Sequence, residues 1–202
     1  MNRLLVLAAA ALAAAAGAWW LWKEQTMNAL AEVLRASLPP RLARFGAELA
    51  AAAVRTAPAE LGARAWAFLL AGVMDRESRG GDVLSPRGPA GTGDVGHGRG
   101  LMQIDDRPYH LTEDDPRYNQ KEAARSVVRM DFIESGDWAD PVKNIAFGAA
   151  HLRFYYDQAD SLPAAIAAYN AGPKALTARD PDSVTTGGNY SRDVQARAAG
   201  WA

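Results

Sequence analysis

The stretch LAGVMDRESRGGDVLSPRGPAGTGDVGHGRGLMQID, residues 70–105, decides how this chain of 202 residues is organised. Apolar residues recur at helical spacing at its start, and Glu77 falls on the same face; the apolar members are Trp66, Leu69, Leu70 and Val73. Gly80 and Gly81 follow and can end the helix in left-handed geometry. The pattern predicts a buried helix with a carboxylate on its apolar face near its C-terminal end.

A carboxyl group in that place would lie at the edge of a cleft, partly removed from water. Loss of water raises the pKa of a carboxyl group and keeps it protonated near neutral pH. A protonated carboxyl group can donate its proton to a glycosidic oxygen. A single glutamate near a helix end is most often a solvated surface residue, so the residues around Glu77 decide between the two interpretations.

Two aspartates follow in a glycine-rich segment. Asp94 lies in GTGDVGHGRG, residues 91–100, and Asp105 ends the short apolar run GLMQID, residues 100–105. Glycines let backbone and carboxylates approach a ligand closely, although a flexible surface connection has the same composition. A phosphate-binding loop is excluded because no GK[ST] sequence follows.

Four sequence motifs, in order, resemble one protein family. Residues 77–80 (ESRG), 100–104 (GLMQI) and 168–172 (AYNAG) resemble the E-S-x-G, G-L-M-Q-I and A-Y-N-A-G motifs of the lysozyme-like transglycosylase (SLT-like) superfamily. The closer resemblance is to goose-type lysozyme, through RES, GDxGxGxGLMQxD, AYNAG and NYxxDVxAR. It covers roughly residues 64–198.

This resemblance implies a mainly α, α+β lysozyme-like fold, with a helical bundle around a catalytic helix and a small irregular β-lobe near residues 92–104. It implies an enzyme that hydrolyses the β-1,4 bond between N-acetylmuramic acid and N-acetylglucosamine in peptidoglycan. Glu77 matches the general acid. Asp94 and Asp105 match the aspartates that position the attacking water, and inverting hydrolysis needs about 6.5–9.5 Å between the carboxyl groups.

Other residues of the motifs are candidates for substrate binding. The resemblance places Tyr169, at the end of a helix, near the acid or the sugar, and Tyr190 of NYxxDV in the cleft. Gln103 and Asn170 are expected to bind sugar rather than to take part in the chemistry. His97 and Arg99 either contact substrate or are solvated loop residues, and His151 is expected to be packed or half-exposed on its helix.

Two alternative functions stay open. A lytic transglycosylase needs no second carboxylate, because the muramoyl 6-hydroxyl attacks internally and leaves a 1,6-anhydro product with Glu77 alone as base and acid. A non-catalytic cell-wall-binding or virion protein on the same fold is the alternative from another class. Such a protein would tend to lose the acid, which is present here.

The composition excludes several classes of site and partner. A net charge of −1 gives no nucleic-acid footprint. The chain has no cysteine and three widely spaced histidines, so disulfides and a zinc site are not expected. We expect no cofactor, no metal and a monomer.

The N-terminus predicts a membrane anchor. Residues 4–22 carry no charge, and this uncharged stretch is about as long as a membrane-spanning helix. Residues 16–18 (AGA) could serve as a cleavage site, but cleavage there would leave tryptophans at the new terminus. We therefore favour an uncleaved signal-anchor over residues 1–26, with Trp19, Trp20 and Trp22 at the lipid interface and the catalytic domain on the periplasmic or extracytoplasmic side.

The remaining chain divides into two further segments. Residues 27–63 predict one helix that ends before Pro39 and a second, residues 41–56, that ends before Pro58. This segment is either a stalk or a helical extension packed on the catalytic domain, residues 64–202. Within that domain, Ser161 and Ser191 are predicted to cap helices.

Overall fold

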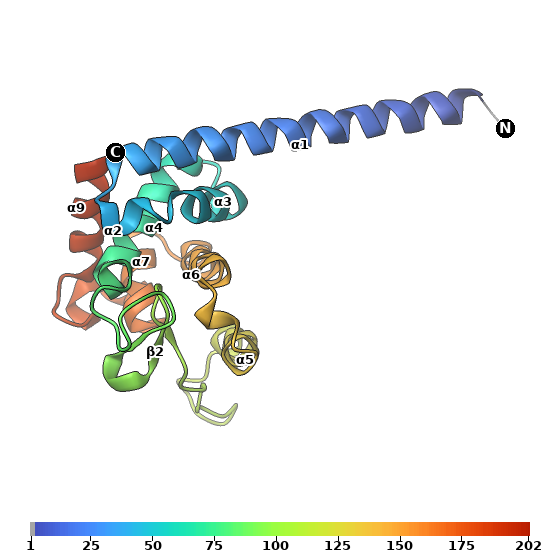
Figure 1. Cartoon of the computed structure of the whole chain (residues 1–202). Helices are drawn as coiled ribbons and strands as arrows, with labels where there is room; N and C mark the ends of the chain where they lie inside the picture. The colour runs from blue at the N-terminus through green and yellow to red at the C-terminus, as the bar shows by residue number, and fades with distance from the viewer. Residues whose placement is uncertain (1–2) are drawn as a thin grey trace.

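A computed structural model describes the backbone of residues 3–202 and the side chains of residues 18–202. The fold is mainly helical with one small sheet (Figure 1), which confirms the predicted fold class. The α-helices are α1 (Arg3–Ser37), α2 (Pro40–Ala43), α3 (Gly46–Thr56), α4 (Gly62–Ser78), α5 (Gln120–Glu134), α6 (Pro141–Tyr156), α7 (Leu162–Ala171), α8 (Lys174–Thr177) and α9 (Tyr190–Trp201). Short 3-10 helices are η1 (Arg79–Gly81), η2 (Asp94–Gly96), η3 (Asp137–Ala139) and η4 (Pro181–Val184).

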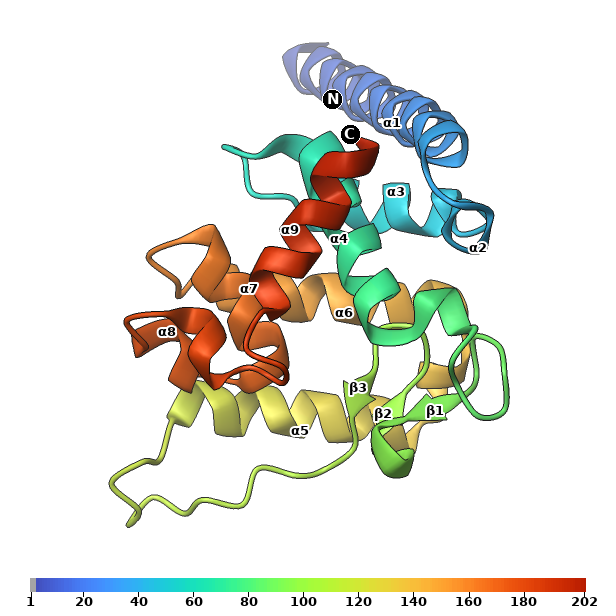
Figure 2. The same cartoon turned by 90° about the vertical axis from the view of Figure 1, so that its left-hand side faces the viewer.

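Helix α4 is the central helix of the domain. Every residue from Trp66 to Asp75 is buried, and α9 crosses over α4 while α3 packs against it (Figure 2). Gly72 allows the crossing, because a Cβ atom there would lie 2.7 Å from the Val194 carbonyl oxygen of α9. The predicted buried helix that carries Glu77 near its end is confirmed.

The end of α4 differs slightly from the prediction. The left-handed C-cap is Arg79, with φ of 49°, and Gly80 and Gly81 continue with φ of 65° and 92°. Glycine is needed at position 80 for its positive φ and also for close packing, since a Cβ atom there would lie 2.4 Å from the Arg41 carbonyl oxygen. The sharp turn therefore brings the chain after Glu77 against α2.

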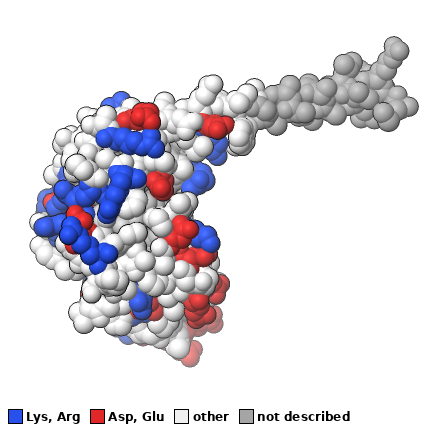
Figure 3. All heavy atoms as spheres, viewed as in Figure 1, with Lys and Arg blue, Asp and Glu red and all other residues white. Residues whose placement is uncertain are grey.

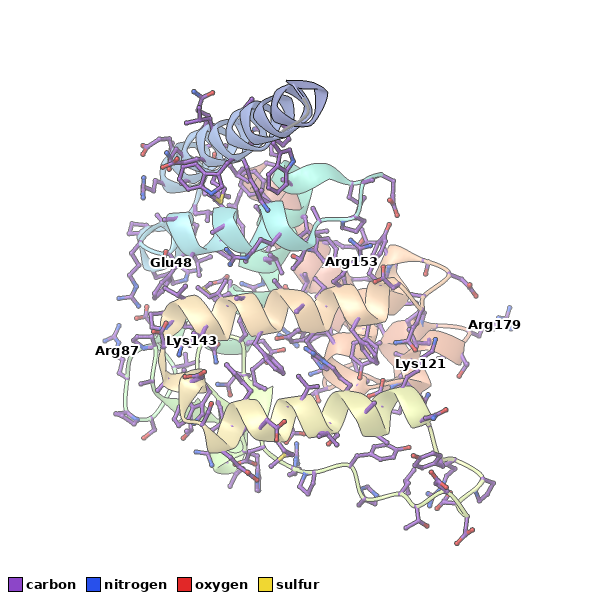
Figure 4. All side chains as sticks on the ribbon, turned by 90° about the vertical axis from the view of Figure 1, so that its right-hand side faces the viewer. Glu48, Arg87, Lys121, Lys143, Arg153 and Arg179 are labelled. Carbon is purple, nitrogen blue, oxygen red and sulfur yellow. The ribbon has the colours of Figure 1, made fainter. Side chains whose placement is uncertain are left out.

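The segment 27–63 packs on the rest of the chain, residues 64–202. Figures 1 and 4 show α1, α3, α6 and α5 in successive layers, and α3 contacts α1, α4 and α6. The buried apolar residues of segment 27–63 belong to the same hydrophobic core as those of α4. They are Leu30, Ala31, Leu34, Leu38, Leu42, Phe45, Leu49, Ala50, Ala52 and Ala53. Arg153 of α6, labelled in Figure 4, donates to the carbonyl of Thr56 at 3.1 Å. Each fully buried leucine contributes about 2 kcal/mol, so these helices help to stabilise the domain.

The predicted second helix over residues 41–56 is wrong in one respect. The chain turns at Arg44 and Phe45, and this turn separates α2 from α3. The turn buries Phe45 and brings Gly46 against α1, where a Cβ atom would lie 3.0 Å from the Arg35 side chain. Close packing of α3 on α1 therefore overrides the continuous helical pattern.

The small sheet is a three-stranded antiparallel meander. Strands β1 (Thr92–Gly93), β2 (Gly98–Arg99) and β3 (Ile104–Asp105) pair in the order β1-β2-β3. Thr92 pairs with Arg99, and Gly98 pairs with Asp105. The short strands predicted near residues 92–104 are confirmed, and the sheet ends at Asp105.

The N-terminal helix α1 extends past the domain (Figure 1). Trp19, Trp20 and Trp22 on it are exposed. Over the described part of the chain, no helix is both long and apolar enough to cross a membrane. The predicted anchor, residues 1–26, lies largely in residues 1–17, whose side chains are outside the described residues, so it stays a prediction, as do the predicted segment boundaries.

Charges are mixed on the face of the molecule in Figure 3, where acidic and basic side chains are interspersed. Asp75 is a buried carboxylate with two partly exposed arginine partners. The carboxylate of Asp75 on α4 accepts hydrogen bonds from Arg41 of α2, with an Nε–Oδ1 distance of 2.8 Å, and from Arg197 of α9. Asp75 therefore ties α2 and α9 to the last turns of the helix that carries Glu77.

Candidate active site

A cleft of about 920 Å³ lies between the last turn of α4, the β-lobe and helices α5 to α7. The cleft is lined by the residues that match the catalytic and sugar-binding positions of the motifs: Glu77, Asp94, Gln103, Asp105, Tyr169, Asn170 and Tyr190. They come from four segments that are far apart in sequence, namely α4, the β-lobe, α7 and α9. The fold thus brings the motif residues to one cavity.

Glu77 reaches the cleft from the last turn of α4 and is only partly exposed. The pKa of its carboxyl group is raised to about 7, chiefly by burial and additionally by the negative charge of Asp94. A hydrogen bond from the Tyr190 hydroxyl and the charge of Arg76 act in the opposite direction. The carboxyl group of Glu77 can therefore stay protonated near neutral pH, where an ordinary glutamate is ionised.

Tyr190 holds one oxygen of this carboxyl group. Its buried hydroxyl donates a hydrogen bond to Glu77 Oε1. Burial, and the nearby Glu77 charge, raise the pKa of Tyr190 well above its usual value, so the hydroxyl stays a donor. With Oε1 occupied, a proton on the carboxyl group sits on Oε2.

A buried aspartate fixes the start of α9 and with it Tyr190. Ser191 was predicted to cap this helix, and this is wrong: the N-cap is Asn189, without a side-chain cap bond. Asp182 accepts hydrogen bonds from the backbone N–H of Ser191 at 2.7 Å and of Arg192 at 3.2 Å. A carboxylate from η4 therefore replaces the local cap, because α9 begins inside the protein.

The AYNAG residues lie at the end of α7. The Tyr169 hydroxyl donates to the Met102 carbonyl oxygen at 2.7 Å, so it ties α7 to the β-lobe. Burial and the negative charge of Glu77 raise the pKa of Tyr169, and both residues line the cleft. Asn170 Oδ1 accepts from the backbone N–H of Thr186 at 2.9 Å, and its amide nitrogen has no partner among the described residues.

Gln103 lines the cleft, but its side chain also fills the β-lobe. Its Nε2 donates to the Gly100 carbonyl oxygen at 2.7 Å. Its Oε1 lies against Gly93 and Gly98, where an added Cβ atom would come within 2.2 and 2.1 Å of it. Two of the glycines in the loop are therefore required by the packing of Gln103 between strands.

His97 and Arg99 do not line the cleft. Both bind Asp106: His97 Nδ1 lies 2.8 Å from Oδ1, and Arg99 Nε donates to Oδ2 at 3.0 Å. These bonds close the β-lobe after β3. His151, in contrast, is buried as expected and lines the cleft wall, packed edge-on against the rings of Tyr155 and Tyr169.

The two candidate water-binding aspartates lie on the β-lobe side of the cleft. Asp94 stands in the β1–β2 turn with φ of 45°, and Asp105 is the last residue of β3. Arg107 contacts both: its Nη2 donates to Asp94 at 2.9 Å and its Nε to Asp105 at 2.8 Å. The two carboxylates are thus linked by one guanidinium group.

Comparison with known proteins places the chain in a family. The family model for lysozyme g matches residues 65–201, which include every residue of the site. The chain belongs to the lysozyme g family. The goose-type resemblance of the motifs is therefore confirmed.

Two curated relatives show the extent of the match. Lysozyme g of Gallus gallus is 36% identical over 131 residues, which cover 64% of this chain and 54% of the relative. Lysozyme g of Takifugu rubripes is 33% identical over 136 residues, which cover 64% of this chain and 63% of the relative. The lysozyme g match begins at α4, so α1, α2 and α3 precede it.

Sequence reasoning missed several polar residues around this lysozyme g site. Arg107 follows Asp105 by two residues, and this Asp-x-Arg spacing was the available signal. Glu122 and Arg125 of α5 line the far wall of the cleft, where Tyr155 donates to Glu122 at 3.0 Å and Arg125 Nε to His151 at 3.2 Å. Burial raises the pKa of Glu122. No local sequence pattern predicts that α5 lines the cleft.

Among the described residues, no group of three or more histidine, aspartate or glutamate side chains is placed to hold a metal ion. The cleft has a carboxyl group with a raised pKa on one side and a linked pair of carboxylates on another.

Proposed function

We propose that this chain hydrolyses the β-1,4 bond between N-acetylmuramic acid and N-acetylglucosamine in peptidoglycan. The observation that carries the proposal is Glu77, a carboxyl group with a pKa of about 7 that faces a cleft also lined by Asp94 and Asp105. Membership of the lysozyme g family supports the same reaction class. The chain spans 54% and 63% of the length of the two relatives, so activity and substrate are argued from the site.

In this proposal, Glu77 donates the Oε2 proton to the glycosidic oxygen as the bond to the anomeric carbon breaks. A water molecule attacks that carbon, and one of the two aspartates accepts a proton from the water. Tyr190 keeps the Glu77 carboxyl group in one orientation, through its bond to Oε1. Protonation by a positioned carboxyl group accelerates such reactions by about 10²–10⁴-fold.

The presence of two aspartates favours hydrolysis over internal attack by the muramoyl 6-hydroxyl. Internal attack uses Glu77 alone and gives no role to Asp94 or Asp105. Both line the cleft, and Arg107 contacts both.

Two substitutions test the proposal. Glu77→Gln should abolish release of sugars from purified peptidoglycan while circular dichroism shows an unchanged fold. Asp105→Asn should lower the rate by at least about 100-fold if the aspartates serve water attack. Activity near the wild-type level in Glu77→Gln would refute the role of Glu77, and activity near that level in Asp105→Asn would favour internal attack.

We also propose that the N-terminal segment holds the enzyme at a membrane, with the cleft on the extracytoplasmic side. Trp19, Trp20 and Trp22 are exposed on α1, and indole rings favour the membrane interface. The full chain should float with liposomes in a density gradient. Substitution of the three tryptophans by alanine should weaken flotation without loss of glycosidase activity, and unchanged flotation would contradict their role.

A further inference from the structure

One arginine bonds both cleft aspartates. Arg107 Nη2 donates to Asp94 Oδ2 at 2.9 Å, and Arg107 Nε donates to Asp105 Oδ1 at 2.8 Å. The backbone N–H of Arg107 adds a third bond to Asp105 Oδ1 at 2.9 Å. Within residues 18–202, neither carboxylate has another hydrogen-bond donor.

The same contacts leave one oxygen of each aspartate available. Asp94 Oδ1 and Asp105 Oδ2 have no hydrogen-bond donor among the described residues, so each can accept from a water molecule in the cleft. The backbone of Arg107 is held, because its carbonyl oxygen accepts from Arg129 Nη2 of α5 at 2.7 Å. This bond connects the segment that carries Arg107 to α5.

The Asp94 carboxylate depends on the hydrogen bond from Arg107 more than the Asp105 carboxylate does. Asp94 stands in a left-handed turn, its side chain is 59% exposed, and the next residue, Val95, is 99% exposed. Without Arg107, no other described residue would donate a hydrogen bond to the Asp94 carboxylate. Two carboxylates lining one cleft would then repel each other. A planar guanidinium can bond two carboxylates in a fixed geometry, whereas the ammonium of lysine acts as a single point charge.

We propose that Arg107 is a positioning residue that holds Asp94 and Asp105 as one water-binding pair and so favours water over the muramoyl 6-hydroxyl as the attacking group. The inference rests on the proposed function. In hydrolysis, the water oxygen bonds to the anomeric carbon, the glycosidic bond breaks, a water proton passes to an aspartate, and the Glu77 proton passes to the leaving oxygen.

Internal attack differs only in the nucleophile. The 6-hydroxyl oxygen bonds to the anomeric carbon, its proton passes to the Glu77 carboxylate that has just donated its own, and the product is a 1,6-anhydro sugar. The aspartates take no part in this step. Loss of Arg107 therefore slows hydrolysis and leaves the internal route unaffected.

The chain contains a matched control. Arg117 forms the same local contacts with Asp115, through its backbone N–H at 2.8 Å and its Nε at 2.9 Å. It bonds no second carboxylate among the described residues and does not line the cleft. A comparison of the two arginines separates the bridge to Asp94 from the local Asp-x-Arg structure.

The test uses the full chain, purified peptidoglycan and mass spectrometry of the released sugars, with initial rates at several substrate concentrations. Arg107→Gln and Arg107→Lys should each lower kcat for reducing-end products by about 100-fold, as displaced catalytic groups do, with KM unchanged and a larger anhydro fraction. Arg117→Gln should match wild type. Asp94→Asn combined with Arg107→Gln should be no slower than the slower single variant, because both remove one unit.

Thermal unfolding of each variant shows whether the fold is kept, and Arg107→Lys retains the charge if Arg107→Gln is unstable. The inference is overturned if Arg107→Gln keeps the wild-type kcat and product ratio, or if Arg117→Gln loses as much. If wild-type protein releases only anhydro sugars or none, the proposed hydrolysis itself fails. The two failures are therefore distinguishable.

Discussion

Replacing Tyr190 with phenylalanine should move the pH range of the enzyme upward. The Tyr190 hydroxyl donates to Glu77, and this bond lowers the pKa of the carboxyl group against the larger, opposite effect of burial. Without the hydroxyl, burial acts unopposed by this bond, so the pKa of Glu77 rises above about 7. The acid form then persists to higher pH.

The size of the change follows from the hydrogen bond. A bond to a charged group is worth about 1.5–3 kcal/mol, and 1.36 kcal/mol corresponds to one pKa unit. Part of the bond is also made to the protonated form, and water can replace another part. We therefore expect the pKa of Glu77 to rise by about 1 and the basic limb of the kcat/KM profile to move up by about one pH unit.

The assay is kcat/KM on labelled peptidoglycan between about pH 5 and 9. Tyr156→Phe is the matched control, because the Tyr156 hydroxyl donates to Glu60 at 2.9 Å and lies outside the cleft. Its profile should match that of wild type, whatever the absolute rates are. A basic limb that stays in place or moves down in Tyr190→Phe would refute the assignment of that limb to Glu77.

Three further substitutions test the stability of the framework. Glu77→Gln should be more stable than wild type above pH 7 and should lose this advantage below about pH 4.5. The reason is that ionisation of Glu77 costs the folded state about 3 kcal/mol when its pKa rises to about 7. Urea unfolding at pH 4 and pH 8 measures the difference. Asp75→Ala should lower the free energy of unfolding by about 1–3 kcal/mol, since it removes the buried acceptor of Arg41 and Arg197, whose partly exposed guanidinium groups stay hydrated. Asp182→Ala should cost about 2 kcal/mol and weaken activity by loosening the start of α9, with thermal unfolding and initial rates as the two readouts.

The parts of the fold that the sequence predicted are those with local signals. The apolar spacing around Trp66 and Val73 predicted the buried helix α4, and Ser161 was correctly predicted to cap α7. The motif residues Glu77 and Tyr169 were expected at one site, and both line the cleft. Their roles in the reaction remain proposals.

The parts that the sequence did not predict depend on contacts between distant segments. The hydrogen bonds that satisfy the first backbone N–H groups of α9 come from Asp182 of η4 rather than from the Ser191 side chain, because the helix begins beside this buried carboxylate. The Gln103 side chain packs against Gly93 and Gly98 in the β-lobe, and no periodic pattern in the sequence predicts this contact. The bridge made by Arg107 to Asp94 joins residues that are 13 positions apart across the sheet.

The measurement that tests the central claim most directly is mass spectrometry of the sugars that the purified protein releases from peptidoglycan. Hydrolysis by Glu77 with water held by Asp94 and Asp105 predicts products with reducing-end muramic acid. Products lighter by one water molecule would contradict the account, because they would mean that the muramoyl 6-hydroxyl attacks and that neither aspartate holds the nucleophile.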